Sequence, residues 1–255
     1  MLIPLAQFNI QRPERVTYDF PLPNPADLIN HIKSKSLRSF LRNSDEVLAK
    51  NNIEWKYEDL TEQKFLEWLP YYKEKMEEHN YVVRAKEKWY QEQIKKGHIL
   101  KGLFFYQNKK LIGSGIFVLH GNTANFAYKA SDRISVSSMK GSSFGSIIEF
   151  LFLKLVAESG IYTTASSKSR NAFGFINTPG YLDNKLKFGY KICHSPGMPL
   201  LNDIQINESG IVLFFGLQNG KFILFCLQPE SHRGKELFDK SRFNTSGIPF
   251  KEIYY

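Results

Sequence analysis

Cysteine is scarce in this sequence. The two that occur, Cys193 and Cys226, do not form a C-x-x-C pair. This spacing excludes the usual zinc knuckle and the dithiol redox motif. The two thiols could bridge, but free thiols in a reducing compartment are the simpler expectation for a chain with so few cysteines.

Long hydrophobic runs are also missing. The first fifteen residues contain no basic segment followed by a long apolar one, so they do not match the pattern of a signal peptide. The most apolar stretch, Ile147 to Ala157, is interrupted by Glu149 and Lys154 and is far too short to span a bilayer. We therefore expect no membrane span and a cytoplasmic location.

Several common catalytic motifs are absent as well. The sequence has no Ser-His-Asp pattern, nucleophile elbow, Walker loop or dinucleotide fingerprint. His120 and His194 have no carboxylate or cysteine at a telling spacing, so we expect surface histidines and no metal. No block of five basic residues occurs, which argues against a dedicated nucleic-acid arm.

What the sequence does contain is typical of one globular domain with extensions. Hydrophobic residues make up 42% of the 255 residues, enough for a substantial core. The net charge is +9. Such a field attracts polyanions such as nucleotides, CoA, nucleic acid or anionic lipid, although a solvated basic surface explains it equally well.

Local patterns predict helices in the first hundred residues. Prolines keep residues 1–27 irregular, and we expect an extended arm there. A helix is expected from Asp27 to Asn51, a second one opened by the cap Thr61, and a third from Ala85 to Lys96. The first of these helices carries a basic face, made of Lys33, Lys35, Arg38 and Arg42.

Strand-like alternation begins at Gly102. Turns at 108–110 and 121–122 predict a three-stranded antiparallel meander, which is followed by a long apolar helix to about Ser159 and a strand at 161–166. Asn219-Gly220 between two apolar runs predicts a hairpin with a type I′ turn.

These patterns together predict an α/β (α+β) fold. We expect a mixed, mostly antiparallel central sheet flanked by helices, with an N-terminal helical segment and a C-terminal β-hairpin. The expected division is an arm and helical segment at 1–100, a core at 101–192 and an extension at 193–255. The hairpin is apolar on both faces, so it could form a homodimer surface instead of core.

A loop of small residues lies between the meander and the long helix, and reads Lys140-Gly141-Ser142-Ser143-Phe144-Gly145. Its backbone N–H groups and the helix N-terminus could bind a diphosphate, to which Lys140 would add a charge. Gly and Ser before a helix are equally common as simple caps. The loop resembles the R/Q-x-x-G-x-G/A pyrophosphate loop of the GNAT acyltransferases, with Ser143 and Gly145 in place of the two glycines.

A second resemblance is to the FemAB-like branch of these proteins. The segment Gly180 to Gly189 resembles its closing G-[IL]-Y-x-F-K-x-x-F-G motif, with Lys185 matching and Asn184 replacing an aromatic residue. Tyr128 to Asp132 resembles the end of the family's central strand. The resemblance covers roughly residues 30–192 and implies acyl transfer from a thioester, or from aminoacyl-tRNA, to an amine. Full FemAB enzymes carry two such units and are longer.

Candidate site residues follow from this resemblance, each with an ordinary structural alternative. Asp132 would hold or deprotonate an amine, or cap a turn. Tyr181 would donate a proton to the leaving group, or be a core aromatic. Lys185 would bind a phosphate or carboxylate of the acceptor, or be solvated. Asn171 would contact the pantetheine or the acceptor, or support its loop. The loop from Lys140 to Gly145 would hold CoA.

Three functions are compatible with this sequence. The first is an N-acyltransferase that moves an acyl group, most simply acetyl, from acetyl-CoA to an amine of a small molecule or precursor, without a metal. The second is a FemAB-like aminoacyl-tRNA-dependent transferase, which the basic helix motivates. The third is a non-catalytic GNAT-fold binding protein, motivated by Ser143 in the loop and by Lys185 at the position of the usual GNAT tyrosine.

Overall fold

The computed structural model describes ten stretches of the chain: residues 1–79, 81–132, 134, 143–161, 163–165, 169–174, 179–194, 197–206, 208–235 and 247–255. The chain forms two compact units. The terminal unit comprises Met1–Asp19 and Lys168–Tyr255, and the central unit comprises Phe20–Ser167. This division differs from the three consecutive segments expected from the sequence, because the N-terminal arm pairs with strands from the last third of the chain.

The central unit begins with short helices in place of the one helix expected from Asp27 to Asn51. Ile32 is extended, with ψ at 120°, and the side chain of Ser34 then caps a new helix by accepting from the N–H of Leu37. Asn43 separates that helix from the next. The helices are α1 (Leu28–His31), α2 (Lys35–Arg42) and α3 (Ser44–Lys50).

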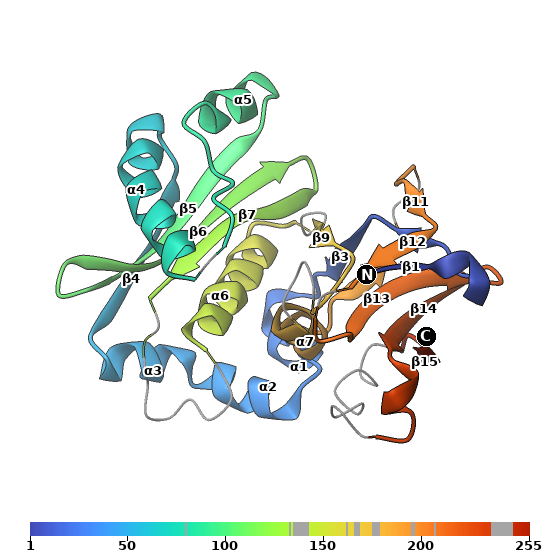
Figure 1. Ribbon diagram of the computed structural model, residues 1–255. Helices are drawn as coiled ribbons and strands as arrows, with labels where there is room; N and C mark the ends of the chain where they lie inside the picture. Colours follow the sequence, from blue (N-terminus) through green and yellow to red (C-terminus); the bar gives the residue numbers. More distant parts are fainter. Residues whose placement is uncertain are drawn as a thin grey trace. The chain divides into compact units, whose positions relative to one another are not determined.

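The predicted meander is the middle of the central unit's sheet (Figure 1). The order in this unit is β4-β5-β6-β7-β8, in which β7 and β8 are parallel and the other pairs are antiparallel. The strands are β4 (Ile53–Asp59), β5 (Ile99–Gln107), β6 (Lys110–His120), β7 (Thr123–Ser131) and β8 (Thr163–Ala165).

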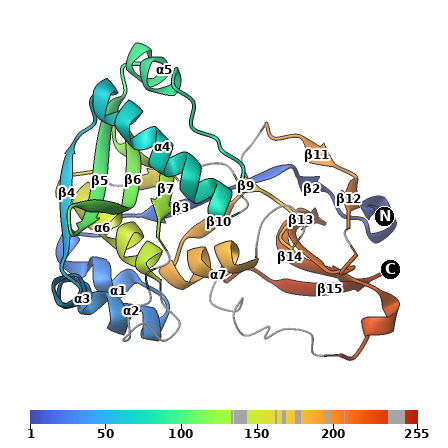
Figure 2. The ribbon, with the colours of Figure 1, turned by 60° about the vertical axis from the view of Figure 1, so that its left-hand side comes forward.

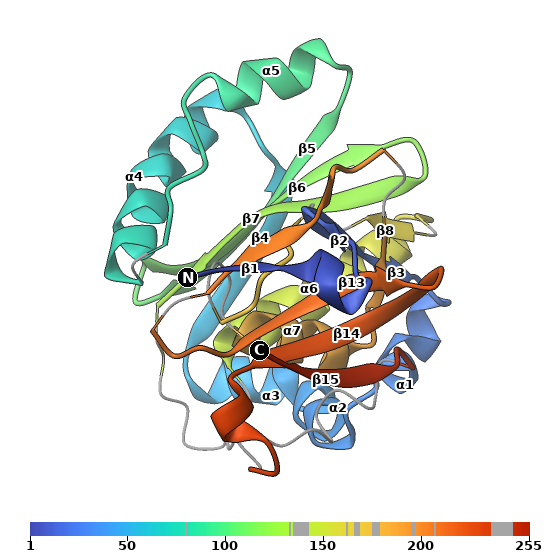
Figure 3. The same cartoon turned by 45° about the vertical axis from the view of Figure 1, so that its right-hand side comes forward.

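Helices cover both faces of this sheet. Successive residues of β6 show this: the hydroxyl of Ser114 accepts from the indole of Trp68 in α4 (Glu62–Glu78), whereas a Cβ on Gly113 would meet the ring of Phe144 in α6 (Phe144–Glu158). Neighbouring strand residues point to opposite faces, so α4 and α6 lie on opposite sides. Figure 3 shows α4 and α5 (Trp89–Lys95) beside the meander.

Local signals account for several helix ends. Thr61 caps α4, with its hydroxyl accepting from the N–H of Lys64 at 3.2 Å, as predicted. Gly160 follows α6 with a φ of +74°. The expected helix from Ala85 is shorter than predicted: α5 begins only at Trp89, and Ala85 is buried in the preceding loop. Within the described residues, no helix is long and apolar enough to cross a bilayer.

The terminal unit is built around the N-terminal arm, which contributes three strands. β1 (Leu2–Pro4) pairs with β12 (Asp203–Gln205), and β2 (Arg12–Pro13) pairs with β11 (Leu200–Leu201). β3 (Arg15–Pro21) pairs with β9 (Ser169–Arg170) and β10 (Lys191–Cys193) through its terminal-unit residues. The remaining helices are η1 (Leu5–Phe8), η2 (Pro25–Asp27, in the central unit), α7 (Pro179–Phe188) and η3 (Glu230–His232).

The hairpin of the terminal unit has the predicted turn. Asn219 and Gly220 have φ angles of 51° and 72° between β13 (Val212–Gln218) and β14 (Lys221–Gln228), and β15 (Phe250–Tyr254) adds a parallel strand (Figure 2). Its apolar side chains are core, since Phe214 and Phe225 are fully buried in one hydrophobic cluster. The argument for a dimer surface on this hairpin therefore fails. Neither Cys193 nor Cys226 forms a disulfide.

Candidate functional site

The central strand β7 is irregular at Ala127. Phe126 pairs with Phe117 of β6 and Tyr128 pairs with Ile116, so Ala127 has no opposite residue. This is a β-bulge, which bends the strand and turns its backbone groups away from the regular ladder. The bulge directly precedes Tyr128 to Asp132, the stretch that resembles the end of the family's central strand.

Among the described residues, the outer edge of β7 has ladder partners only at the start of the strand. Its partner β8 pairs only with Thr123 and Ala124, at the start of the strand. From residue 125 to 131, no ladder partner occurs on that edge among the residues that the structure describes. Backbone N–H and C=O groups require partners, so this edge can accept a ligand that supplies them.

Helix α6 begins beside β6 because Gly113 makes room for its first side chain. A Cβ on Gly113 would lie 2.5 Å from Cε1 of Phe144, which is closer than side chains tolerate. Ser143 is the N-cap residue, but its hydroxyl does not bond to the helix backbone and instead lies 3.3 Å from the hydroxyl of Ser146. The N–H groups of Phe144 and Gly145 have no acceptor within the described part of the chain. These donors can bind an anion.

Lys129 brings a positive charge to the same helix end. Its ammonium donates to the buried carboxylate of Glu149 at 2.8 Å and to the carbonyl of Gly145 at 3.5 Å. Glu149 is only 1% exposed, so it does not face solvent as its place near the start of the helix would suggest. A Cβ on Gly145 would contact only the Ser143 hydroxyl and the Lys129 ammonium, at 3.5 and 3.9 Å. The fold itself therefore does not require glycine at position 145.

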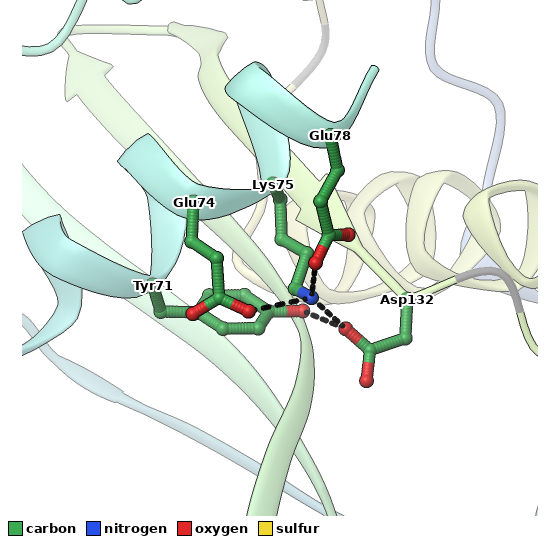
Figure 4. A network of polar contacts seen from close by, with 5 residues as sticks. All are labelled: Tyr71, Glu74, Lys75, Glu78 and Asp132. Carbon is green, nitrogen blue, oxygen red and sulfur yellow. Dashed lines mark hydrogen bonds and ion pairs between the residues drawn. The ribbon is translucent and has the colours of Figure 1, made fainter.

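Asp132 follows β7 directly and belongs to a polar network with α4 (Figure 4). The ammonium of Lys75 lies 3.1 Å from Oδ1 of Asp132, 3.0 Å from Glu74 and 2.7 Å from Glu78. The hydroxyl of Tyr71 donates a long hydrogen bond, 3.5 Å, to the same Oδ1. The second carboxylate oxygen of Asp132 has no partner in the described residues, and the side chain is 23% exposed.

The protonation of this network follows from burial and neighbouring charge. Burial lowers the pKa of Lys75, but hydrogen bonds to Glu78, Glu74 and Asp132 outweigh it, so the pKa lies above its ordinary 10.5. Burial, and then the charge of Asp132, raises the pKa of Tyr71 above 10.0. Lys75 is therefore a permanent cation and Tyr71 a neutral hydrogen-bond donor near pH 7.

An aromatic cluster lies between α4, α5 and β7. The ring of Tyr128 lies 5.9 Å from Trp68, 5.4 Å from Tyr72 and 4.9 Å from Trp89 between centroids. Trp89 in turn lies 5.3 Å from Phe65. These rings fill the α4 side of the sheet next to the bulge and give the network at Asp132 an apolar neighbour.

Two predicted site residues lie in the terminal unit. The ammonium of Lys185 lies over the rings of Tyr190 and Tyr181, 4.1 and 5.6 Å from their centroids, and the residue is 4% exposed. Lys185 is thus buried among aromatic rings, not solvated. Tyr181 also packs edge-on against Tyr18 at 5.7 Å.

The side-chain amide of Asn171 is hydrogen-bonded within the terminal unit. Its side-chain N–H groups donate to the carbonyls of Pro13 and Phe215, and its oxygen accepts from the N–H of Phe215. Every polar atom of this buried side chain therefore has a backbone partner. These bonds support the structural alternative for Asn171, in which it holds its loop.

Sequence reasoning identified part of this arrangement. Lys140, Gly141 and Ser142 lie outside the described residues, whereas Ser143, Phe144 and Gly145 open α6 as expected.

Three residues with polar contacts at this site, Lys75, Lys129 and Tyr71, were not predicted from the sequence. Little in the sequence distinguishes them. Lys75 stands on the apolar stripe of α4, seven residues after Trp68, and Lys129 interrupts a largely apolar strand. Tyr71 does not interrupt an apolar pattern in this way. In the part of the chain that the structure covers, no group of His, Cys, Asp or Glu could hold a metal.

Comparisons with known proteins bear on the fold. No family model and no curated protein matches the sequence. The crystal structure of FemX is similar, with a TM-score of 0.53, 11% identity and coverage of 71% of this chain and 60% of that one. The chain thus spans about three fifths of FemX. Over this region the chain has the fold of FemX, as the resemblance to FemAB-like proteins predicted.

Two further structures are similar at lower scores. The PaiA N-acetyltransferase from Thermoplasma acidophilum, in complex with coenzyme A, gives a TM-score of 0.39 and 11% identity, with coverage of 60% of this chain and 99% of that one. A tandem GNAT protein from the clavulanic acid biosynthesis pathway gives 0.40 and 10%, with coverage of 72% and 53%.

Proposed function

We propose that this protein is an N-acyltransferase that moves an acyl group, acetyl in the simplest case, from acyl-CoA to a primary amine. One observation carries the proposal. The last residues of β7 bring Lys129 beside the start of α6 and lead to Asp132, and among the described residues this part of the strand has no partner on its outer edge and one oxygen of Asp132 has no partner.

The donor would bind along β7. Its diphosphate would face the ammonium of Lys129 and the N–H groups of Phe144 and Gly145, which have no acceptor among the described residues, and the helix dipole also favours negative charge there. The thioester carbonyl would accept from a backbone N–H at the end of β7, beside Asp132, which would stabilise the oxyanion as the amine attacks. The loop residues Lys140, Gly141 and Ser142 would complete the phosphate site.

The acceptor amine would bind at Asp132. The free carboxylate oxygen would take a proton from the incoming ammonium, which leaves a neutral nucleophile. The nitrogen–carbon bond then forms, the carbon–sulfur bond breaks, and the proton lost by the nitrogen neutralises the departing thiolate. Tyr181 as a proton donor and Lys185 as a group for an acidic part of the acceptor remain proposals from the sequence alone, and both residues lie in the terminal unit.

An aminoacyl-tRNA donor is the second candidate. The exposed Lys33, Lys35 and Arg42, at and just before α2, favour it because contacts to phosphates dominate nucleic-acid binding. Salt-sensitive binding of tRNA in a filter assay, lost when these three residues are changed to Gln, would support this donor in place of acyl-CoA.

The test is calorimetric titration with acetyl-CoA and CoA at low salt. We expect micromolar binding that Gly145→Trp abolishes, because the indole would fill the space over the helix start. Gly180→Trp is the matched control, since Gly180 is an exposed helical glycine of the terminal unit with no atom near its Cβ position. Binding unchanged in Gly145→Trp would remove this helix start from the donor site.

Turnover is measured as thiol release from acetyl-CoA with ethanolamine, glucosamine, L-lysine and putrescine as acceptors. Release that depends on both amine and enzyme, and that Asp132→Asn suppresses, would support catalysis. CoA binding without release for any amine would favour the non-catalytic reading of the fold.

A further inference from the structure

The ammonium of Lys75 is enclosed by carboxylates at the end of β7. Its side chain is 7% exposed, and three oxygens surround the nitrogen, from Glu78 at 2.7 Å, Glu74 at 3.0 Å and Asp132 at 3.1 Å (Figure 4). Burying an ammonium is costly unless it is paired and hydrogen-bonded, and here each of its three donors has an acceptor.

The three carboxylates are not equivalent. Glu74 and Glu78 belong to the same helix as Lys75 and are 62% and 49% exposed, whereas Asp132 comes from β7 and is 23% exposed. The two glutamates therefore hold the ammonium from the solvent side. The contact to Asp132 is the one that joins α4 to the end of the central strand.

This contact uses only one oxygen of Asp132. Oδ1 receives both the ammonium of Lys75 and the hydroxyl of Tyr71, while the other oxygen has no partner in the described region. A carboxylate anchored at one oxygen cannot rotate freely about its terminal bond. The free oxygen is thus presented in one direction, which is the requirement for a group that must meet an incoming amine.

We propose that Lys75 is a positioning residue for Asp132: it anchors Oδ1 so that the second oxygen faces the acceptor amine. This inference rests on the proposed N-acyltransferase function and deepens it. It assigns the amine subsite to the space next to α4, and it places Glu74 and Glu78 as the groups that orient the ammonium. Lys75 itself does not touch the substrate.

The first experiment compares substitutions of Lys75 in the thiol-release assay, using the amine of the panel with the fastest release. Lys75→Met should lower kcat/KM for that amine by about tenfold to hundredfold, because a misoriented base loses much of its effect. The Kd for acetyl-CoA should be unchanged. Lys75→Arg, which keeps the charge and several donors, should restore most of the rate. Lys73→Met is the matched control, because Lys73 is an exposed lysine two residues away on the same helix.

Lys75→Met leaves three carboxylates without their cation and could unfold the protein. Glu78→Gln is the milder variant, because Glu78 is half exposed and the amide keeps an acceptor for the ammonium. It should lower kcat/KM less than Lys75→Met does, while Glu77→Gln, an exposed neighbour, should not change it.

A double-mutant cycle separates positioning from a purely structural role. If Lys75 acts through Asp132, then Lys75→Met in an Asp132→Asn background should cause no further loss of kcat/KM. Additive losses, or equal losses for Lys75→Arg and Lys75→Met, would overturn the assignment. Absence of release in the wild type with every amine would instead reject the proposed function, and this inference with it.

Discussion

Lys129 on β7 and Glu149 on α6 form an ion pair of 2.8 Å that places an ammonium against the first turn of the helix. A cation at this end is unfavourable by itself, because the helix dipole is positive there. The carboxylate of Glu149, 1% exposed, offsets the repulsion. An anion bound at the helix start would offset it as well, so the arrangement costs less with a phosphate present.

Lys129→Met should weaken CoA binding by about tenfold or more, as expected for the loss of one charged contact to phosphate. It should also lower the salt dependence of binding. Since the single change leaves Glu149 buried without its cation, the double variant Lys129→Met with Glu149→Gln is measured alongside it. Lys110→Met is the control, because Lys110 is an exposed lysine at the start of β6. Unaltered CoA affinity in both Lys129 variants would exclude the contact.

Gly113→Ala should destabilise the protein by about 1–3 kcal/mol, because its Cβ would lie 2.5 Å from the Phe144 ring. Phe144 is the first residue of α6, so moving its ring should also disturb the start of this helix. The affinity for CoA should therefore fall as well. Gly180→Ala is the same chemical change at a helical glycine with open space and should be neutral or stabilising by up to about 1 kcal/mol. Urea unfolding and calorimetry measure the two effects. A Gly113→Ala protein as stable as Gly180→Ala would contradict the packing.

Ser114→Ala should cost about 1–3 kcal/mol of unfolding free energy. The change leaves the indole N–H of Trp68 buried without its acceptor, which now lies 2.8 Å away. Trp68→Phe in the Ser114→Ala background removes the unsatisfied donor, so the second change should cost less there than in the wild type. Urea unfolding of the four proteins is the measurement, and equal costs in both backgrounds would show that the bond does not matter.

Stability should decline at alkaline pH, partly through Tyr71 and Lys75. Both have folded-state pKa values above their ordinary values, 10.0 and 10.5, so both bind their proton more tightly in the folded protein. Their contribution is complete below pH 10 and is lost as the pH rises through the folded values. Tyr71→Phe should therefore unfold with a shallower decline between pH 9 and 11 than the wild type. Identical slopes in urea unfolding would argue against the raised pKa.

Asn171→Ala should destabilise the terminal unit by about 3 kcal/mol or more, since two buried carbonyls and one buried N–H lose their partner. CoA affinity of the protein that remains folded should be unchanged. Hydrogen exchange of the N–H of Phe215 reports the loss directly. If Asn171→Ala weakened CoA binding without faster hydrogen exchange at Phe215, Asn171 would belong to the CoA-binding site.

Short-range features were predictable because their causes lie within a few residues. The cap Thr61, the turn Asn219-Gly220 and the strand alternation of the meander were all read correctly. The helix predicted from Asp27 to Asn51 was wrong in its continuity. Apolar spacing continued across Ile32, but the extended backbone there and the cap at Ser34 divide it.

The site was predictable only where it coincided with a local motif. The start of α6 at Ser143 to Gly145 was such a motif. The pairing of Lys129 with Glu149 joins a strand to a helix, and the contact of Lys75 with Asp132 joins residues 57 positions apart. Neither spacing is that of one helix or one strand, so no periodicity could reveal it.

The amino-acid sequence was enough to predict the meander, the turn at Asn219-Gly220, the cap at Thr61 and the absence of the common catalytic motifs. These depend on backbone preferences and on apolar periodicity, which act locally. Only the folded structure reveals that β7 bulges at Ala127 and that, among the described residues, one oxygen of Asp132 has no partner. It also reveals that the side chain of Asn171 is hydrogen-bonded to backbone groups of Pro13 and Phe215. Such outcomes depend on which distant groups compete for the same hydrogen bonds, and only the folded chain brings those groups together.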